Sequence, residues 1–325
     1  MIKKVFINSI DSYKPLLSIS VAMAVYNGEG FIFEQLSSIF NQTMPPNEIV
    51  ISDDGSTDNT VEIIKSFKSK YDKKNIIKLI FNDSIKKGHV NNFLNACINT
   101  TGDIVFFSDQ DDVWLKSKIS MMVNAMIKYN LTSVHSNEFY TDKELRIGNY
   151  YDYMHRNFIL YNDRVFYDCH MYIFDFHFMI MNKFEPNGCC MCFKKGLIDY
   201  FVKYIQYCKI LKPFGQDYIV FYIAGIVGKC GFLNMPLIKR RIHGKNVMGK
   251  VNTKFSIHNY FNYIFKRKKY LYDFIYYLNK TISIRKYIYY RMVALFGVHM
   301  FKWIFYCVYK NFIRIMTLEY KKKVV

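Results

Sequence analysis

The stretch SISVAMAVYN, residues 18–27, decides how the first half of this chain folds. It is apolar almost throughout, and its isoleucine and valines favour extended backbone. An apolar run of this length is typical of a strand that is buried on both faces of a sheet. Asn27, Gly28 and Gly30 then break the pattern. The stretch therefore predicts a central strand that ends in a turn.

Helices and further strands alternate after this strand. The apolar spacing predicts a helix (31–42), a strand with an acidic turn (47–60), a helix (61–71), a strand (76–83), a loop and helix (86–103) and a strand (104–107). This order predicts an α/β fold with a doubly wound, mostly parallel sheet. Ligands of such sheets bind at the carboxyl ends of the strands. The polar residues at those ends are Tyr26, Asp53, Asp54, Asp109, Asp111 and Asp112.

The middle of the chain, residues 131–250, has the pattern of mixed strands and loops. Residues 187–201 indicate a short strand followed by a helix. Residues 214–246 indicate a helix that contains Asp217, then a turn and a final strand, with His243 just after it. This half is therefore expected to be less regular than the first.

Three carboxylates in four positions, Asp109, Asp111 and Asp112, follow the strand at 104–107. Like charges at the end of a buried strand disfavour one another's ionisation. A solvated turn, a bound cation or a polar ligand would each account for them. On an extended segment Asp109 and Asp111 would point the same way and reach one ligand, with Asp112 turned toward a neighbour. Hard oxygen ligands of this kind suit Mg²⁺ or Mn²⁺ held together with the phosphates of a substrate.

The neighbouring turns offer the groups that a nucleotide needs. Asp53 and Asp54 supply acceptors for a base or a ribose, and Tyr26 supplies an aromatic face. The chain has no GxxxxGK[ST] loop, so a nucleotide diphosphate would be bound without one. A plain structural interpretation stays open as well, in which Tyr26 packs, Asp217 caps a helix and His243 is an ordinary loop residue.

Two other folds with nucleotide or metal sites are disfavoured. Asp53 ends a second strand, as the ribose-binding acid of a dinucleotide fold does, but Phe33 stands where the third glycine of that fingerprint belongs. An EF-hand is excluded because Trp114 occupies the position of the loop glycine. Trp114 is expected to pack behind the acids, and Asn91 and Asn92 to be surface loop residues.

Three motifs in order resemble those of a known family. They are SISVAMAVYNGEGFIFEQLSSIFNQT (18–43), EIVISDDGSTDNT (48–60) and GDIVFFSDQDDVW (102–114). The combination is similar to a family 2 glycosyltransferase with the GT-A fold, strongly over residues 17–125 and weakly to about residue 249. The sequences SDQDDVW and HGKN resemble bacterial polysaccharide glycosyltransferases, including the rhamnosyltransferase-like subgroup.

The resemblance implies a role for each matching residue. The residues expected to bind the nucleotide sugar are Ala24, Tyr26, Asn27, Glu29, Asp53, Asp54, Asp109 and Asp111. Those expected to hold the metal are Asp111, Asp112 and His243, and the division of metal and ribose roles among the three acids stays open. Asp217 matches the position of the general base. Gln216 precedes it where the family often has Glu or His.

The implied activity is transfer of a sugar from a UDP- or dTDP-linked donor to a hydroxyl of a lipid-linked oligosaccharide or polysaccharide precursor. It would depend on Mn²⁺ or Mg²⁺ and invert the anomeric carbon in a single displacement. The expected parts are an N-terminal extension (1–16), a nucleotide-sugar-binding half (17–130), an acceptor-binding half (131–250) and a basic aromatic helical tail (251–325). A non-catalytic protein that binds nucleotide sugars or polyanions is the alternative.

The net charge of +19 is concentrated in the tail, where residues 251–325 hold 15 Lys and Arg against two acids, or +13. Basic and aromatic residues together are typical of a segment that lies on anionic lipid. Packing on the catalytic unit and nucleic-acid binding would use similar residues. A membrane span is disfavoured because His299 and Lys302 interrupt the apolar run. With a lipid-linked acceptor implied, we expect attachment to the inner face of the bacterial cell membrane and no nucleic-acid partner.

The eight cysteines show no spacing typical of a disulfide framework or a zinc site. Cys189, Cys190 and Cys192 are expected to be small apolar core residues, as suits a reducing cytoplasm. The N-terminal residues MIKKVFINSIDSYK contain no apolar stretch long enough for a signal peptide. These observations favour a cytoplasmic protein.

Overall fold

The computed structural model describes residues 3–6, 17–83, 87–147, 170–174, 186–207 and 215–243. The chain divides into two compact units, residues 1–251 and 252–325, and every described residue belongs to the first. The expected basic tail lies outside the described residues, so its membrane contact stays a prediction. Among the helices that the structure describes, none combines the length and the hydropathy of a membrane span.

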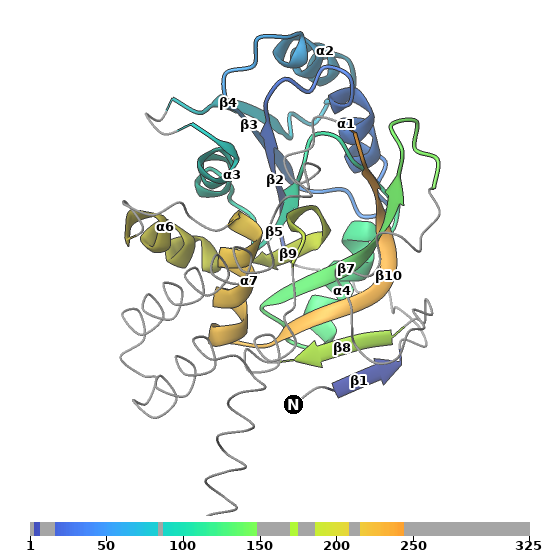
Figure 1. Cartoon of the computed structure of the whole chain (residues 1–325), viewed down its shortest axis with the longest axis vertical. Coiled ribbons are helices and arrows are strands. Elements are labelled where there is room, and N and C mark those ends of the chain that lie inside the picture. The colour runs from blue at the N-terminus through green and yellow to red at the C-terminus, as the bar shows by residue number, and fades with distance from the viewer. Residues whose placement is uncertain are drawn as a thin grey trace, which may run out of the picture. The chain divides into compact units, whose positions relative to one another are not determined.

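One mixed sheet organises the first unit (Figure 1). Its described strands are β1 (Lys3–Phe6), β2 (Ile19–Val25), β3 (Glu48–Asp53), β4 (Ile77–Phe81), β5 (Ile104–Ser108), β6 (Val113–Trp114), β7 (Ser133–Thr141), β8 (His170–Phe174), β9 (Met191–Lys194) and β10 (Cys230–Arg241). Neighbours follow the order β1-β8-β10-β7-β9-β5-β2-β3-β4, and β6 pairs with β10. The described helices are α1 (Ile32–Phe40), α2 (Thr60–Tyr71), α3 (His89–Ile98), α4 (Lys118–Lys128), α6 (Leu197–Tyr207) and α7 (Gln216–Val227), with the short 3₁₀ turn η3 (Gly188–Cys190).

The first half of the sheet is parallel, as the alternation of elements predicts. Strands β5, β2, β3 and β4 are parallel neighbours, and helices α1, α2 and α3 connect them in chain order. This confirms the doubly wound arrangement. Because the four strands run the same way, their carboxyl ends meet at one edge of the sheet.

The burial of strand β2 explains why the sequence of a central strand is apolar almost throughout. Val21, Met23 and Val25 belong to the core that also contains buried residues of α1, α2 and α4. The alternate residue Ala22 is equally buried, and α3 contacts the strand. Side chains alternate between the two faces of a strand, so both faces of β2 are covered and both must be apolar.

The second half of the sheet is mixed, which agrees with the expectation for residues 131–250 over the part of that range that the structure describes. Strand β9 is antiparallel to both β5 and β7 and so joins the two halves. The long strand β10 runs parallel to β7 and antiparallel to β8 and β6. Residues 1–16, expected only as an extension, contribute β1, which pairs with β8. No sequence signal pointed to that pairing.

The cysteines of the described residues pack in the core. Cys189, Cys190 and Cys192 are almost fully buried, as are Cys97 and Cys230, and all five are free thiols. This confirms the interpretation of the cysteine cluster as small apolar residues. Trp114 is also buried, with its ring 5.7 Å from that of Phe106, and so is the predicted packing anchor.

Candidate functional site

The carboxyl edge of the parallel strands carries the residues that the sequence singled out. Tyr26 follows β2 and is exposed, Asp53 ends β3 and is buried, and Asp109 follows β5. Ala24 lies inside β2, in register with Ser52 of β3. The fold thus places aromatic, carboxylate and backbone groups from three strands along one edge.

The loop that carries the acids is bent. The chain turns at residues 110–111, directly after β5. The ligand atoms of Asp109, Asp112 and Cys189 lie within 4.8 Å of one another. Asp111 instead lies with its Oδ2 2.8 Å from Nε2 of His243. The segment is bent at residues 110–111 and not extended as expected, and a ligand shared by Asp109 and Asp111 stays a prediction.

Burial and mutual repulsion act on the acids of this loop. Burial, and then the neighbouring Asp111, raises the pKa of Asp109 well above its usual range. The same causes raise the pKa of Asp112, which is 2% exposed. The Oδ2 atom of Asp112 has no hydrogen-bond partner within the described ranges. A buried, unpaired carboxylate oxygen beside like charges is what a bound cation would stabilise.

The donor set fits a divalent cation of the Mn²⁺ or Mg²⁺ type. Carboxylate oxygens come from Asp109, Asp111 and Asp112, and one imidazole nitrogen comes from His243. Oxygen donors suit both ions, and imidazole is compatible with a transition metal such as Mn²⁺. Asp109 and Asp112 form one close group and Asp111 and His243 another, and a single ion site made of all four stays a prediction.

The turn after β3 uses its acids to hold its own backbone. Asp53 Oδ2 accepts hydrogen bonds from the N–H groups of Gly55 and Ser56, both at 2.7 Å. Asp53 Oδ1 is buried and has no partner in the described part of the chain. Asp54 accepts from the side chain of Asn82 and from the N–H of Gly88. Asp53 Oδ1 is thus an acceptor of this turn whose hydrogen bonding is incomplete within the described residues.

Asn27 and Glu29 support the same turn from the end of β2. Asn27 Oδ1 accepts from the N–H of Thr57 at 2.8 Å. Glu29 Oε2 accepts from the backbone and the side chain of Asn59. Both side chains bind the chain itself in this structure, so the contact with a nucleotide implied by the resemblance stays a prediction.

Gln110, the middle residue of the acidic loop, is a site residue that the sequence did not reveal. Its Oε1 accepts from the N–H of Tyr26 at 2.9 Å, and its Nε2 donates to the Tyr26 carbonyl at 3.0 Å. A Cβ atom at Gly28 would lie 2.4 Å from Gln110 Oε1, so a larger residue there would displace the Gln110 side chain. The glutamine joins the acid loop to the turn after β2, and no spacing in the sequence could have indicated it.

Asn92 is a second residue that the sequence placed wrongly. It lies in α3, is 2% exposed, and its side chain donates to the carbonyl of Val25 at 3.1 Å. The expectation of a surface loop residue is therefore wrong. The predicted helix within residues 86–103 exists, but it begins early enough to include Asn92, because Val90 and Phe93 have helical spacing.

Asp217 lies in the first turn of α7 and is partly buried. Its Oδ1 accepts from the N–H of Tyr218 at 2.9 Å and its Oδ2 from the N–H of Gly188 at 3.2 Å. Burial raises the pKa of Asp217 to about 6, although these N–H groups oppose the change. Its charge also acts on Asp109, which places both in one electrostatic environment. A carboxyl that titrates near neutrality suits a general base.

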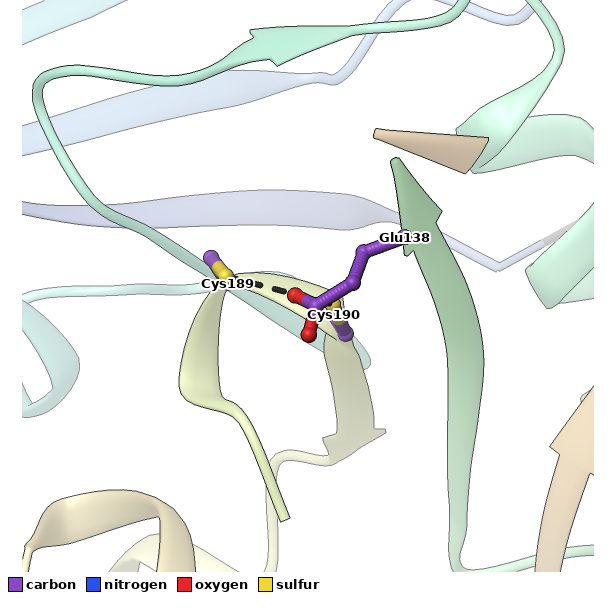
Figure 2. A group of neighbouring side chains, drawn as sticks. All are labelled: Glu138, Cys189 and Cys190. Atoms are coloured by element: carbon purple, nitrogen blue, oxygen red, sulfur yellow. Dashed lines mark hydrogen bonds between the residues drawn. The ribbon is translucent and has the colours of Figure 1, made fainter. Parts of the chain in front are cut away.

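Glu138, Cys189 and Cys190 form a second group of ligand-type atoms beside the acids (Figure 2). The Cys190 thiol donates to Glu138 Oε2 at 3.2 Å. Arg240 lies 3.6 Å from the Glu138 carboxylate, and the ammonium of Lys118, fully buried, donates to the Cys189 carbonyl. The side chains of Arg240 and Lys118 already supply positive charge beside the Glu138 carboxylate and the cysteines, so we assign no metal to this group.

A family model described as Glycosyl transferase family 2 matches residues 20–188, just over half of the chain.

The chain is 38% identical over 118 residues to the dTDP-rhamnosyl transferase RfbG of Shigella flexneri, an alignment that covers 35% of this chain and 40% of that protein. It is 31% identical over 119 residues to the UDP-Glc:alpha-D-GlcNAc-diphosphoundecaprenol beta-1,3-glucosyltransferase WfgD of Escherichia coli, covering 37% and 45%. These alignments span less than half of each relative. A longer alignment, 29% identical over 271 residues, covers 81% of this chain and 75% of an uncharacterized glycosyltransferase of Haemophilus influenzae.

Among solved structures, the chain resembles residues 1–349 of S. aureus TarS in complex with UDP-GlcNAc. The TM-score is 0.58 at 15% identity, and the match covers 86% of this chain and 71% of that one. At this identity the likeness concerns the fold alone. It confirms the GT-A architecture that the sequence motifs predicted.

Proposed function

The chain belongs to glycosyltransferase family 2, and on that premise we propose that it extends a lipid-linked oligosaccharide or polysaccharide precursor with a sugar from a UDP- or dTDP-linked donor. The observation that carries the proposal is the meeting of Asp111 and His243 beside Asp109 and Asp112, at the edge where parallel strands bind ligands. The names of two relatives support the donor and acceptor classes: RfbG is a dTDP-rhamnosyl transferase, and WfgD acts on a diphosphoundecaprenol-linked sugar.

The donor would bind along the turns after β2 and β3. The exposed ring of Tyr26 would stack on the base, with Ala24 beside it. Asp53 Oδ1, which has no partner in the described part of the chain, would accept a hydrogen bond from the base or the ribose. Asn27, Glu29 and Asp54 hold these turns and are proposed to complete the nucleotide site.

The diphosphate would lie over the acid loop. A bound Mn²⁺ or Mg²⁺ would stabilise the negative charge that develops on the diphosphate as the sugar leaves. We assign Asp111, Asp112 and His243 as the residues that hold the ion, and Asp109 to the nucleotide sugar. The buried and unpaired Oδ2 of Asp112 supports this assignment, because a cation would satisfy it.

Asp217 would accept the proton of the acceptor hydroxyl as that hydroxyl attacks the anomeric carbon. With a pKa of about 6, its carboxyl is mostly ionised at neutral pH and still basic enough to take a proton. One base and a leaving group on opposite faces of the sugar give inversion in a single displacement. The attachment of the protein to the inner face of the cell membrane is proposed from the +13 charge of residues 251–325.

The proposal is tested with the full chain, radiolabelled UDP- and dTDP-sugars, Mn²⁺ or Mg²⁺, and lipid-linked acceptors. Transfer is expected for the wild type and for Asp199→Ala, an exposed acid in the first turn of α6 that matches the placement of Asp217 in α7. Transfer is expected to be lost in Asp111→Ala and in Asp217→Ala. Transfer that survives both substitutions would overturn the assigned roles. Metal-dependent nucleotide binding without transfer or donor hydrolysis would favour a non-catalytic binding protein.

A further inference from the structure

Arg241, the last residue of β10, is joined to the acid loop on two sides. Its Nε donates to the carbonyl of Asp111 at 2.9 Å, and its backbone N–H donates to Oδ1 of Asp112 at 3.1 Å. One residue therefore fixes both the backbone of this loop and one of its buried carboxylates. We propose that Arg241 is the positioning residue that holds Asp111 and His243 in the geometry of the cation site, an inference that rests on the proposed function.

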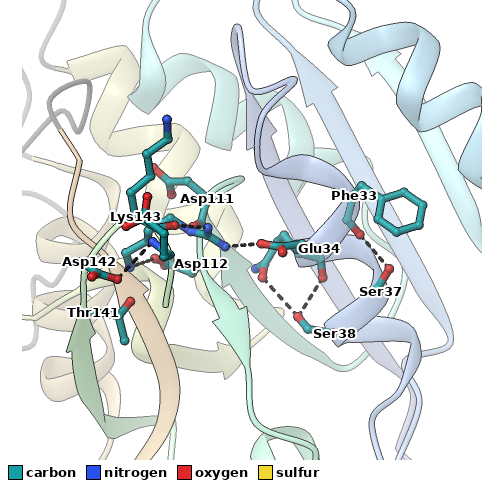
Figure 3. Close-up of polar contacts among 12 residues, drawn as sticks. Phe33, Glu34, Ser37, Ser38, Asp111, Asp112, Thr141, Asp142 and Lys143 are labelled. Carbon is teal, nitrogen blue, oxygen red and sulfur yellow. Dashed lines mark hydrogen bonds and ion pairs between the residues drawn. The ribbon is translucent and has the colours of Figure 1, made fainter. Parts of the chain in front are cut away.

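The remaining nitrogens of the guanidinium connect the loop to two further segments. Nη2 pairs with the carboxylate of Glu34 on α1, and Nη1 donates to the carbonyl of Lys143, which follows β7. Figure 3 shows Glu34 on its helix facing the loop that carries Asp111 and Asp112. Arg241 is only 4% exposed, whereas the Glu34 side chain is 52% exposed. A planar group with several donors in fixed directions can serve all these acceptors at once, and a lysine ammonium cannot.

Phe31 extends this connection to His243. The ring of Phe31 stacks on the imidazole of His243, with centroids 4.6 Å apart and an interplanar angle of 22°. The guanidinium of Arg241 lies over the same ring, 5.0 Å from its centroid. Phe31 immediately precedes α1, so the end of β10 is docked on the start of that helix. Both partners of the Asp111–His243 contact are thus held by groups that meet at Arg241.

The arrangement has the form of an outer shell around ion ligands. Residues that orient ligands without touching the ion typically change metal affinity about 10- to 100-fold when they are removed. Loss of the Arg241 guanidinium would free the Asp111 carbonyl at the bend and remove the attachment to α1. His243, two residues further along the chain, would then no longer be fixed at 2.8 Å from Asp111.

The test measures ion binding rather than turnover. Mn²⁺ is titrated by electron paramagnetic resonance into the full chain with UDP or dTDP present, and nitrogen coupling from a bound histidine is read by spin-echo modulation. For Arg241→Met we expect Mn²⁺ binding about 10- to 100-fold weaker and loss of the nitrogen coupling. Arg241→Lys should weaken binding less, and Glu34→Leu less again. The control is Arg146→Met, because Arg146 has an exposed side chain.

A merely structural role predicts a different result. Folding is monitored by the melting temperature of each variant, and Arg241→Lys and Glu34→Leu decide the question if Arg241→Met does not fold. Unchanged Mn²⁺ affinity and nitrogen coupling in folded Arg241 variants would overturn this inference and leave the proposed function standing. A wild type that binds Mn²⁺ without nitrogen coupling would overturn the role of His243, and with it this inference. A wild type that binds no Mn²⁺ would overturn the metal assignment of the proposed function itself.

Discussion

The two halves of the sheet contribute to the candidate site in different ways. In the parallel half, Tyr26 and Asp109 follow their strands and Asp53 ends one, and the common direction of the strands brings all three to one edge. In the mixed half, His243 reaches Asp111 across 132 positions of sequence through the pairing and docking of β10. The first half thus places its candidate groups by strand direction, and the second places His243 by long-range pairing; under the proposed function, these would be the nucleotide groups and an ion ligand.

Replacement of the proposed base, Asp217, should lower the rate of sugar transfer more than any other change to the second half. Asp217→Asn is expected to lower kcat about 10²- to 10⁴-fold while donor and Mn²⁺ affinities stay unchanged, because Asp217 is assigned to the acceptor hydroxyl and not to the nucleotide or the ion. Burial raises its folded pKa, so its ionised form costs stability at neutral pH, whereas asparagine loses one of the two acceptors for the N–H groups of Tyr218 and Gly188; the melting temperature should therefore change little. Single-turnover kinetics and calorimetry with the donor nucleotide are the measurements. Loss of nucleotide binding in this variant would show that the halves are not separable in this way.

Replacement of the histidine at the end of β10 should have the next largest effect. His243→Ala removes the imidazole that lies 2.8 Å from Asp111, and Mn²⁺ affinity should fall about 10- to 100-fold. Excess Mn²⁺ should restore much of kcat, since the three acids remain. The measurement is the Mn²⁺ dependence of transfer. An unchanged Mn²⁺ requirement would show that the second half adds nothing to the ion site.

The pH dependence of kcat/KM should report the ionisation of Asp217, the proposed base in the second half of the sheet. Asp217 must be ionised to act as a base, so activity should be present above its pKa of about 6 and be lost as the pH falls below it. Below that point kcat/KM should drop about tenfold per pH unit. The residual activity of Asp217→Asn should lack this limb. An identical acidic limb in that variant would assign the titration to another group.

The smallest expected effect concerns the contact that joins the acid loop to Tyr26. Gln110→Met removes two hydrogen bonds to the Tyr26 backbone, and each is worth about 1 kcal/mol. The KM for the donor should therefore rise about 3- to 10-fold, with little change in kcat. A kcat effect larger than the KM effect would place Gln110 in the chemistry rather than in donor binding.

The sequence predicted most of the strands and helices of the parallel half. It predicted few of the long-range contacts made by the mixed half. Apolar runs such as Val21–Val25 and the acids after β3 and β5 follow from local periodicity, because each residue's face is set by its own strand. The bend at residues 110–111 lies where Asp111 and Asp112 accept hydrogen bonds from Arg241 of β10, and no local pattern contains that partner. The same reason hid the contacts of Gln110 with Tyr26 and the strand β1. His243 was found through a motif resemblance, not through any physical pattern.

The central claim is that the acid loop binds a divalent ion together with the donor diphosphate. Calorimetric titration of UDP and of dTDP, with and without Mn²⁺, tests it directly in the wild type, Asp111→Asn and Asp217→Asn. We predict that Mn²⁺ strengthens binding of one of these nucleotides at least about tenfold in the wild type and in Asp217→Asn, and has no such effect in Asp111→Asn. Nucleotide affinity that is independent of Mn²⁺ in the wild type, or equally dependent on it in Asp111→Asn, would contradict the account.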